Sequence, residues 1–185
     1  MAEHHSPAVD PSKMVFRRAR TDEADIAAAL VSERRDWLHA RGIEQWTNDP
    51  APAVRAAVDE GVCWLLVEGD VPVATATLTA DADPDFWTPE EADQPALYLS
   101  KAATRLADRG RGLGKLLIHT AAAYAASQGI PRVRWDAWRT NEALHQHYRE
   151  CGAVHLRTVD APGRFSGALF ELRYDGQEAA AVDPT

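Results

Sequence analysis

Apolar and polar residues follow two patterns along the chain, and together they predict an α/β domain. Short runs rich in β-branched and aromatic residues are typical of strands, and stretches with apolar residues at every third or fourth position are typical of helices. The expected strands are 15–20, 62–67, 71–79, 96–104, 132–138, 153–159 and 166–174, and the expected helices are 22–41, 52–61, 113–128 and 141–151. This order predicts a mixed α/β sheet with a strand–helix–strand crossover between 96 and 138.

The chain has 185 residues, a length that fits one domain with its own core. Residues 1–12 are polar and contain two prolines, and residues 176–185 are polar and rich in alanine. Both segments are expected to be flexible tails. The sequence therefore predicts a single folded domain over residues 13–175.

Composition and charge disfavour several classes of protein. Apolar residues make up 45% of the chain and charged residues 26%, as in ordinary globular proteins, and the net charge of −8 disfavours nucleic acid as a partner. No apolar run approaches the roughly 20 residues of a membrane span, and residues 1–20 lack the apolar segment of a secretory signal. With 2 cysteines, neither a disulfide framework nor a cysteine metal site is expected. These features favour a cytoplasmic protein with no membrane partner.

A basic, glycine-rich segment at 105–115 is the strongest chemical signal in the sequence. It lies between an expected strand and an expected helix, and its basic side chains outnumber its single acid. Its glycines allow the backbone to approach a ligand closely, and the first N–H groups of the following helix lack partners within the helix. The segment is therefore expected to cradle an anion such as a pyrophosphate.

Two familiar phosphate loops do not fit this segment. The Walker pattern would require glycine at position 109 and serine or threonine at position 116, where the chain has Arg109 and Leu116. The dinucleotide-binding pattern G-x-G-x-x-G starting at Gly110 would require a glycine in place of Lys115. These mismatches disfavour a nucleotide-binding phosphotransferase.

One pattern does fit, R-x-x-G-x-G, at Arg109, Gly112 and Gly114. Placed between a strand and a helix, it resembles the pantetheine-pyrophosphate loop of the GNAT superfamily of acyl-CoA-dependent N-acyltransferases. The resemblance covers roughly residues 15–174. The alternative is a basic glycine-rich turn that binds no ligand.

A second motif, in the last expected helix, supports the resemblance. Asn141, Leu144 and Tyr148 stand at positions i, i+3 and i+7 and share one helical face. With Gly152 they match the superfamily's late helix, in which an asparagine opens the helix and a tyrosine faces the cofactor sulfur. An aromatic residue often follows this glycine in the superfamily, whereas this chain has Ala153.

The resemblance implies a mixed, mostly antiparallel twisted sheet of about seven strands with about four helices. The parallel strands 96–104 and 132–138 would splay apart, and the pantetheine arm of acetyl-CoA would enter the gap. Backbone groups of Ala102 and Thr104 would hydrogen-bond the pantetheine amides. The other residues expected to bind this cosubstrate are Arg109, Gly110, Arg111, Gly112, Gly114, Lys115 and Asn141.

The resemblance also implies an activity, the transfer of an acetyl group from acetyl-CoA to a primary amine of a small molecule or peptide by direct attack on the thioester. Such an amine has a pKa of about 10.4 and must lose a proton before it attacks. Tyr148 is expected to be the general acid that protonates the departing thiolate. The base stays open among Glu44, Asp81, Asp85 and His119, and no metal is required.

Two segments are expected to contact the amine. In the superfamily, the acceptor usually meets the segment between the first two helices and the loop before the cofactor strand, which here are residues 42–50 and 80–95. Carboxylates beside aromatic rings suit a cationic amine. The residues of this kind in the two segments are Glu44, Trp46, Asp85 and Trp87.

A non-catalytic module that binds acyl-CoA as a sensor or structural partner is the alternative function, because a fold and a cofactor loop do not establish catalysis. The position of Tyr148, seven residues after Asn141 on the same helical face, favours an enzyme over such a module. The chain is expected to be a monomer or a homodimer, and its residue patterns do not distinguish the two.

Overall fold

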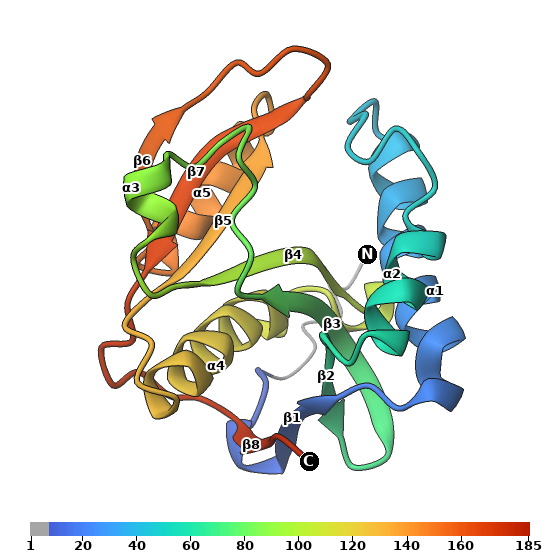
Figure 1. Cartoon of the computed structure of the whole chain (residues 1–185). Helices are drawn as coiled ribbons and strands as arrows, with labels where there is room; N and C mark the ends of the chain where they lie inside the picture. Colours follow the sequence, from blue (N-terminus) through green and yellow to red (C-terminus); the bar gives the residue numbers. More distant parts are fainter. Residues whose placement is uncertain (1–7) are drawn as a thin grey trace. The chain divides into compact units, whose positions relative to one another are not determined.

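The computed structural model describes residues 8–185, which contain eight strands and five α-helices (Figure 1). The chain divides into two compact units. The described part of the first unit comprises residues 8–77, 101–120 and 178–185, and the second unit comprises residues 78–100 and 121–177. The chain passes from one unit to the other within strands β3 (Val71–Thr79) and β4 (Leu97–Thr104) and within helix α4 (Leu113–Ser127).

The strands of the first unit follow the order β3-β2-β1-β8. Strands β1 (Met14–Arg18) and β2 (Cys63–Glu68) are antiparallel, and β2 and β3 form an antiparallel hairpin. Phe16 of β1 and Trp64 of β2 are fully buried, and their rings stack with centroids 4.9 Å apart. Strand β8 (Ala181–Asp183) pairs with β1 in parallel.

Strand β8 is a difference from the expected sheet of about seven strands. It lies in the segment 176–185, which the sequence predicts to be a flexible tail, and it pairs with β1 from Ala181 to Asp183. The buried N–H of Ala180 also donates a hydrogen bond to Oγ1 of Thr120 at 3.0 Å. A strand of three residues is too short to show an alternating pattern, and its partners lie far away in the sequence.

Helices α1 (Ala24–His39) and α2 (Ala51–Asp59) lie side by side in the first unit (Figure 1). Their apolar faces form a core cluster with β2. The buried residues of the two helices are Ala27, Ala28, Leu30, Val31, Leu38, Ala51, Val54, Ala57 and Val58. Ile26 stands on the apolar stripe of the expected helix 22–41, which predicts burial. In the structure it is 45% exposed, because the buried stripe is centred one residue further along.

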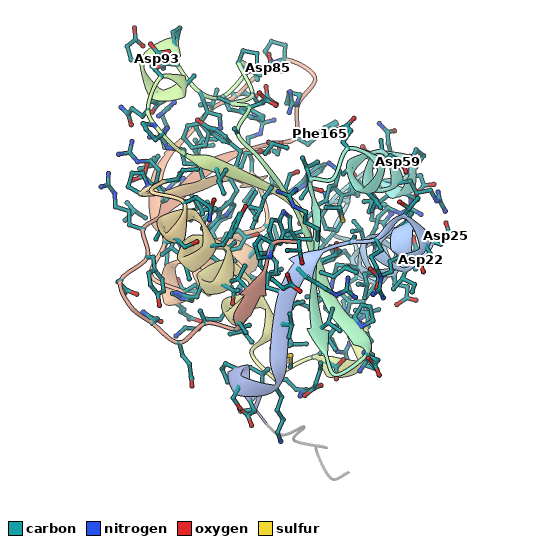
Figure 2. The ribbon with its side chains drawn as sticks, turned by 60° about the horizontal axis from the view of Figure 1, so that its bottom comes forward. Asp22, Asp25, Asp59, Asp85, Asp93 and Phe165 are labelled. Carbon is teal, nitrogen blue, oxygen red and sulfur yellow. The ribbon has the colours of Figure 1, made fainter. Side chains whose placement is uncertain are left out.

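The carboxylate of Glu23 fixes the start of α1, directly after a 3-10 turn (Thr21–Glu23). It accepts two hydrogen bonds of 2.7 Å from the Arg17 guanidinium and one of 2.8 Å from the backbone N–H of Arg20. The Arg17 hydrogen bonds are the main reason that the pKa of Glu23 falls to about 2. Exposed Asp22 and Asp25 lie beside the same turn (Figure 2), where negative charge stabilises a helix N-terminus.

The strands of the second unit follow the order β6-β7-β5-β4. Strand β7 (Ser166–Leu172) is antiparallel to both β5 (Val133–Trp138) and β6 (Val154–Thr158). Strands β4 and β5 are parallel and pair at Leu97–Val133 and Tyr98–Arg134. The pairing ends there among the described residues of this unit, which confirms the splayed parallel pair.

The loop 80–95 contains a short helix that the sequence analysis does not predict. Helix α3 (Pro89–Ala92) is the fifth α-helix, where about four were expected. Thr88 and Glu91 form a capping box at its start, with the Glu91 N–H donating to Oγ1 of Thr88 and the Thr88 N–H donating to Glu91. Upstream, Phe86 and Trp87 are buried in a core cluster of the second unit.

Helix α4 carries mostly apolar residues, and those buried are Leu113, Leu116, Leu117, Ile118, Ala121, Ala122 and Ala125. The helix follows a glycine-rich turn, as the sequence predicts. Within residues 8–185, no helix combines the length and apolar character that crossing a membrane would require.

Candidate functional site

The residues predicted to bind ligands fall into both units, and each group has its own local geometry. The first unit contains Glu44, Trp46, Ala102, Thr104, Arg109, Gly110, Arg111, Gly112, Gly114 and Lys115. The second unit contains Asp85, Trp87, Asn141 and Tyr148.

The glycine-rich loop leads directly into α4. Gly110 and Gly112 have φ angles of +82° and +86°, a region that favours glycine over any other residue. Gly112 accepts the hydrogen bond from the Leu116 N–H at 3.1 Å, so α4 begins at this point. The N–H groups of its first residues, including Gly114 and Lys115, have no partner within the helix, and they stand at the positive end of its dipole. The loop therefore has the backbone that an anion cradle requires.

The guanidinium of Arg111 forms ion pairs with two carboxylates of the protein. It donates to both carboxylate oxygens of Glu68 at 2.8 and 2.9 Å and to Asp108 at 2.9 Å, and its side chain is 12% exposed. Asp108 also accepts from Arg105. Hydrogen bonds from Arg105 and then Arg111 lower the pKa of Asp108, and those from Arg111 lower the pKa of Glu68. A phosphate contact by the Arg111 side chain stays a prediction, and these contacts give the side chain a structural role.

Arg109 and Lys115 provide the available positive charge of the loop. Both side chains are exposed, and neither has a carboxylate partner within residues 8–185. The Arg109 guanidinium lies over the ring of Trp37, 5.4 Å from its centroid. These two cations can therefore meet an anionic ligand without first breaking an ion pair.

The end of β4 is irregular where backbone contacts to the ligand are expected. Lys101 has a φ of +50°, which is uncommon for a residue other than glycine. Beyond it, the carbonyl and hydroxyl of Thr104 each accept a hydrogen bond of 2.8 Å from the Arg34 guanidinium. A ligand amide would have to share that carbonyl with Arg34. The corresponding contacts of Ala102 and Thr104 stay predictions.

Tyr148 of helix α5 (Glu142–Glu150) lies among aromatic rings of the second unit. Its ring makes edge contacts with Trp135 at 5.1 Å and Phe170 at 5.2 Å between centroids. Burial, with smaller contributions from Cys151 and Asp136, raises the pKa of the Tyr148 hydroxyl. The hydroxyl is therefore protonated at neutral pH and can donate a proton or a hydrogen bond.

Asn141 opens α5 as expected. Its side-chain oxygen accepts a hydrogen bond from the Leu144 N–H at 3.1 Å, which is the geometry of an N-cap. This contact explains why an asparagine stands at this position without any ligand. Its role in cosubstrate binding stays a prediction.

The acceptor candidates of the first unit lie after the end of α1. Glu44 is exposed, whereas Trp46 is half-buried and packs against the core cluster of α1, α2 and β2. Trp46 has a φ of +54°, a strained backbone conformation for a bulky residue. Strain of this kind often marks a functional position, so the prediction for Trp46 has a physical argument in its favour.

The acceptor candidates of the second unit are engaged in local contacts. Asp85 accepts a hydrogen bond of 2.5 Å from Arg164, which also pairs with Asp83. Trp87 is 4% exposed and packs edge-on against Tyr98. These contacts argue for structural roles, and acceptor binding by Asp85 and Trp87 stays a prediction. Figure 2 shows exposed Asp85 and Asp93 in this part of the second unit.

The four candidates for the general base differ in exposure. Glu44, Asp81 and Asp85 are exposed, and Asp85 is paired with Arg164. His119 of α4 is 1% exposed, so exchange of a proton with solvent at this side chain is hindered. Over the described residues, no three His, Cys, Asp or Glu side chains form a group able to hold a metal ion.

A comparison of the sequence with models of protein families identifies the family of the chain. The model of the acetyltransferase (GNAT) family matches residues 26–153, which is more than half of the chain. The chain belongs to the acetyltransferase (GNAT) family. The match includes both sequence motifs, at Arg109–Gly114 and at Asn141–Tyr148. No curated protein matches the chain significantly.

Solved structures share the fold of this acetyltransferase. A GNAT-family acetyltransferase from Listeria monocytogenes is 20% identical with a TM-score of 0.70, and the match covers 86% of this chain and 94% of that one. A GNAT-family acetyltransferase from Streptococcus agalactiae is 16% identical with a TM-score of 0.71, covering 89% and 96%. The aminoglycoside acetyltransferase AAC(6')-Ib, solved with coenzyme A and kanamycin, is 14% identical with a TM-score of 0.66, covering 86% and 94%.

Sequence reasoning missed a group of residues in the first unit of this acetyltransferase. The guanidiniums of Arg34 in α1, of Arg41 just beyond its end and of Arg109 in the glycine-rich loop all lie close to the Trp37 ring. Trp37 stands on the apolar stripe of the expected helix 22–41, a position that favours a core residue. The spacing of Arg34 and Arg41 around Trp37, at i−3 and i+4, is the signal that could have indicated a shared face.

Proposed function

We propose that this acetyltransferase transfers an acetyl group from acetyl-CoA to a primary amine of a small molecule or peptide by direct attack on the thioester. The observation that carries the proposal is the loop at 105–115, which combines two glycines at positive φ, the N-terminus of α4 and two unpaired cations. Relatives with the same fold support the cosubstrate, since AAC(6')-Ib and the PaiA N-acetyltransferase of Thermoplasma acidophilum were both solved with coenzyme A.

The loop is suited to hold the pyrophosphate of the cosubstrate. The backbone N–H groups at Gly114 and Lys115 would donate to the phosphate oxygens, as they do at other helix N-termini that bind anions. Arg109 and Lys115 would add positive charge from the exposed side of the loop. The backbone of Ala102 would bind the pantetheine arm, alone or with Thr104.

The proposed acetyl transfer forms one bond, breaks one bond and moves two protons. The neutral amine attacks the thioester carbonyl, the N–C bond forms, the C–S bond breaks, and the amine proton passes to a base or to solvent. The sulfur takes a proton from Tyr148, which regains one from solvent. A free thiol has a pKa of about 8.5, well below that of buried Tyr148. The tyrosine therefore donates a hydrogen bond to the departing sulfur as negative charge builds on it, and the transfer of its proton to the sulfur is completed as solvent returns a proton to the tyrosine oxygen.

The acceptor is a primary amine in this proposal. The kanamycin complex of AAC(6')-Ib supports a small-molecule amine for a protein of this fold. Glu44 and Trp46 are the acceptor candidates that the local geometry favours, since Glu44 is exposed and Trp46 has a strained backbone. Glu44 and Asp81 are the exposed candidates for the base that are free of an arginine partner within residues 8–185.

Thiol release from acetyl-CoA, measured against a panel of polyamines, aminoglycosides, amino acids and peptide N-termini, tests the proposal. Calorimetric binding of CoA should be measured in parallel. We expect turnover with one class of amine. Tight binding of CoA without turnover on any amine would instead indicate a non-catalytic sensor, and absence of CoA binding would refute the cradle.

A further inference from the structure

Three arginines surround Trp37 in the first unit. The guanidinium carbons of Arg41, Arg34 and Arg109 lie 3.8, 5.3 and 5.4 Å from the centroid of the Trp37 ring. Arg34 lies one turn before Trp37 in α1, Arg41 lies two residues beyond the end of α1, and Arg109 comes from the loop before α4. We call these four residues the Trp37 cluster.

The cluster is positively charged and unneutralised. Within residues 8–185, no carboxylate pairs with Arg34, Arg41 or Arg109. Acidic residues are abundant in this chain of net charge −8, and arginines next to the cluster form ion pairs with them. Arg35, the next residue of α1, pairs with Asp36 at 2.8 Å, and Arg111 pairs with Glu68 at 2.8 Å.

The like charges of the cluster repel one another. Burial and the charge of Arg109 lower the pKa of Arg34, which means that the cation at this position is destabilised. Cation–π contacts with the Trp37 ring recover part of this cost. A bound anion would offset this repulsion with its attraction to all three guanidiniums.

The cluster also offers several hydrogen-bond donors. The Arg34 contacts to Thr104 use one nitrogen, and Arg41 donates from one nitrogen to the Trp37 carbonyl at 3.1 Å, so further N–H groups of both fork-shaped guanidiniums remain. The indole N–H of Trp37 is buried and has no hydrogen-bond partner. A buried donor without an acceptor is costly, and the oxygens of an anion would satisfy it.

We infer that the Trp37 cluster binds an anionic oxygen group, a phosphate or a carboxylate, that belongs to one of the two reactants. Arg41 and Arg109 are exposed and can admit such a group from solvent, while Arg34 is half-buried and held by Thr104. The source of the group rests on the proposed function. It is either the 3′-phosphate of CoA or an acid group carried by the acceptor amine.

The indole N–H of Trp37 provides a direct readout by nuclear magnetic resonance. The Trp37→Phe variant assigns its signal among the 6 tryptophans of the chain. We expect this signal to move when the full-length protein is titrated with inorganic phosphate or acetate. A shift with CoA that is absent with dephospho-CoA would assign the site to the 3′-phosphate. Equal shifts with CoA and dephospho-CoA, with none on adding phosphate or acetate, would come from the pyrophosphate beside Arg109 and would overturn the inference. A shift when phosphate or acetate is added to the CoA-saturated protein would assign it to the acceptor.

Variants of Arg34 and Arg41 complete the test. Arg34→Gln and Arg41→Gln should each weaken the binding that moves the signal by about tenfold, because a charge-assisted hydrogen bond is lost. Arg35→Gln is the matched control, since Arg35 lies on the same helix and is already paired with Asp36. Its binding should equal that of the wild type, and thermal unfolding verifies that each variant is folded.

Two further results would overturn the inference. One is a Trp37 signal that none of the four ligands moves, and the other is a shift that survives unchanged in both Arg34→Gln and Arg41→Gln. The proposed function fails separately, when no amine supports thiol release. Since the signal reports binding without turnover, the two failures are distinguishable.

Discussion

Replacing Arg111 by methionine tests whether this arginine stabilises the fold or binds the ligand. The substitution removes hydrogen bonds of 2.8 and 2.9 Å to Glu68 and one of 2.9 Å to Asp108, from a side chain that is 12% exposed. Hydrogen bonds to charged groups contribute about 1.5–3 kcal/mol each, but Glu68 can be solvated and Asp108 keeps Arg105. We therefore expect a loss of about 2–3 kcal/mol in the free energy of unfolding.

Urea unfolding at neutral pH measures this loss directly. For a chain of this length, the same change lowers the melting temperature by about 5–10 °C. Arg55→Met is the matched control, because its ion pair with Asp25 is exposed and contributes about 0–1 kcal/mol. The destabilisation by Arg111→Met should also shrink as the pH falls. Arg111 lowers the pKa of Glu68 and Asp108, so their contribution is present above about pH 4 and is lost below it.

One result would refute this reasoning. If Arg111→Met unfolds at the same urea concentration as Arg55→Met and yet loses affinity for CoA, the Arg111 guanidinium binds the ligand and does not stabilise the fold. The phosphate contact predicted from the sequence would then be correct.

Three further predictions concern the loop, the general acid and the start of α1. Arg109→Ala should weaken calorimetric CoA binding about tenfold and leave the urea midpoint unchanged, since Arg109 has no carboxylate partner within residues 8–185; unaltered affinity would count against the cradle. Tyr148→Phe should reduce kcat about 100-fold with CoA affinity retained, and unchanged turnover would exclude the tyrosine as the acid. Glu23, with its pKa lowered to about 2 by Arg17, stabilises the fold above about pH 4.5, and this contribution disappears as the pH falls through 2. Glu23→Gln should therefore lose about 3 kcal/mol at pH 7 and little at pH 2, and an equal loss at both would contradict the ion pair.

Much of the fold could be predicted from local patterns. The strand–loop–helix order from β4 through the glycine-rich loop to α4 follows from periodicity and from the glycines, because both act over a few residues. The parallel pair β4 and β5 follows from the crossover that α4 makes between them. Strand β8 and helix α3 were missed, since each is shorter than the window in which a pattern can appear.

The candidate site was only partly predictable. The pattern R-x-x-G-x-G locates the loop correctly but assigns Arg109 and Arg111 the same role. Their difference depends on Glu68, which lies at the end of β2 and meets Arg111 through the folded chain. In the same way, Trp87 has an aromatic side chain suited to an amine, and its burial against Tyr98 appears only after folding.

By itself, the sequence determined the order of the elements, the glycine-rich cradle at the start of α4 and the tyrosine of α5, because dihedral preferences, helix ends and periodicity are local properties of the chain. Only the tertiary structure decided which charges are neutralised. It pairs Arg111 with Glu68 of β2 and brings Arg109 to Arg34, Arg41 and Trp37, with no carboxylate on these three arginines within residues 8–185. The physical reason is that an ion pair or an unsatisfied donor depends on distances of a few ångströms between residues that lie far apart in the sequence.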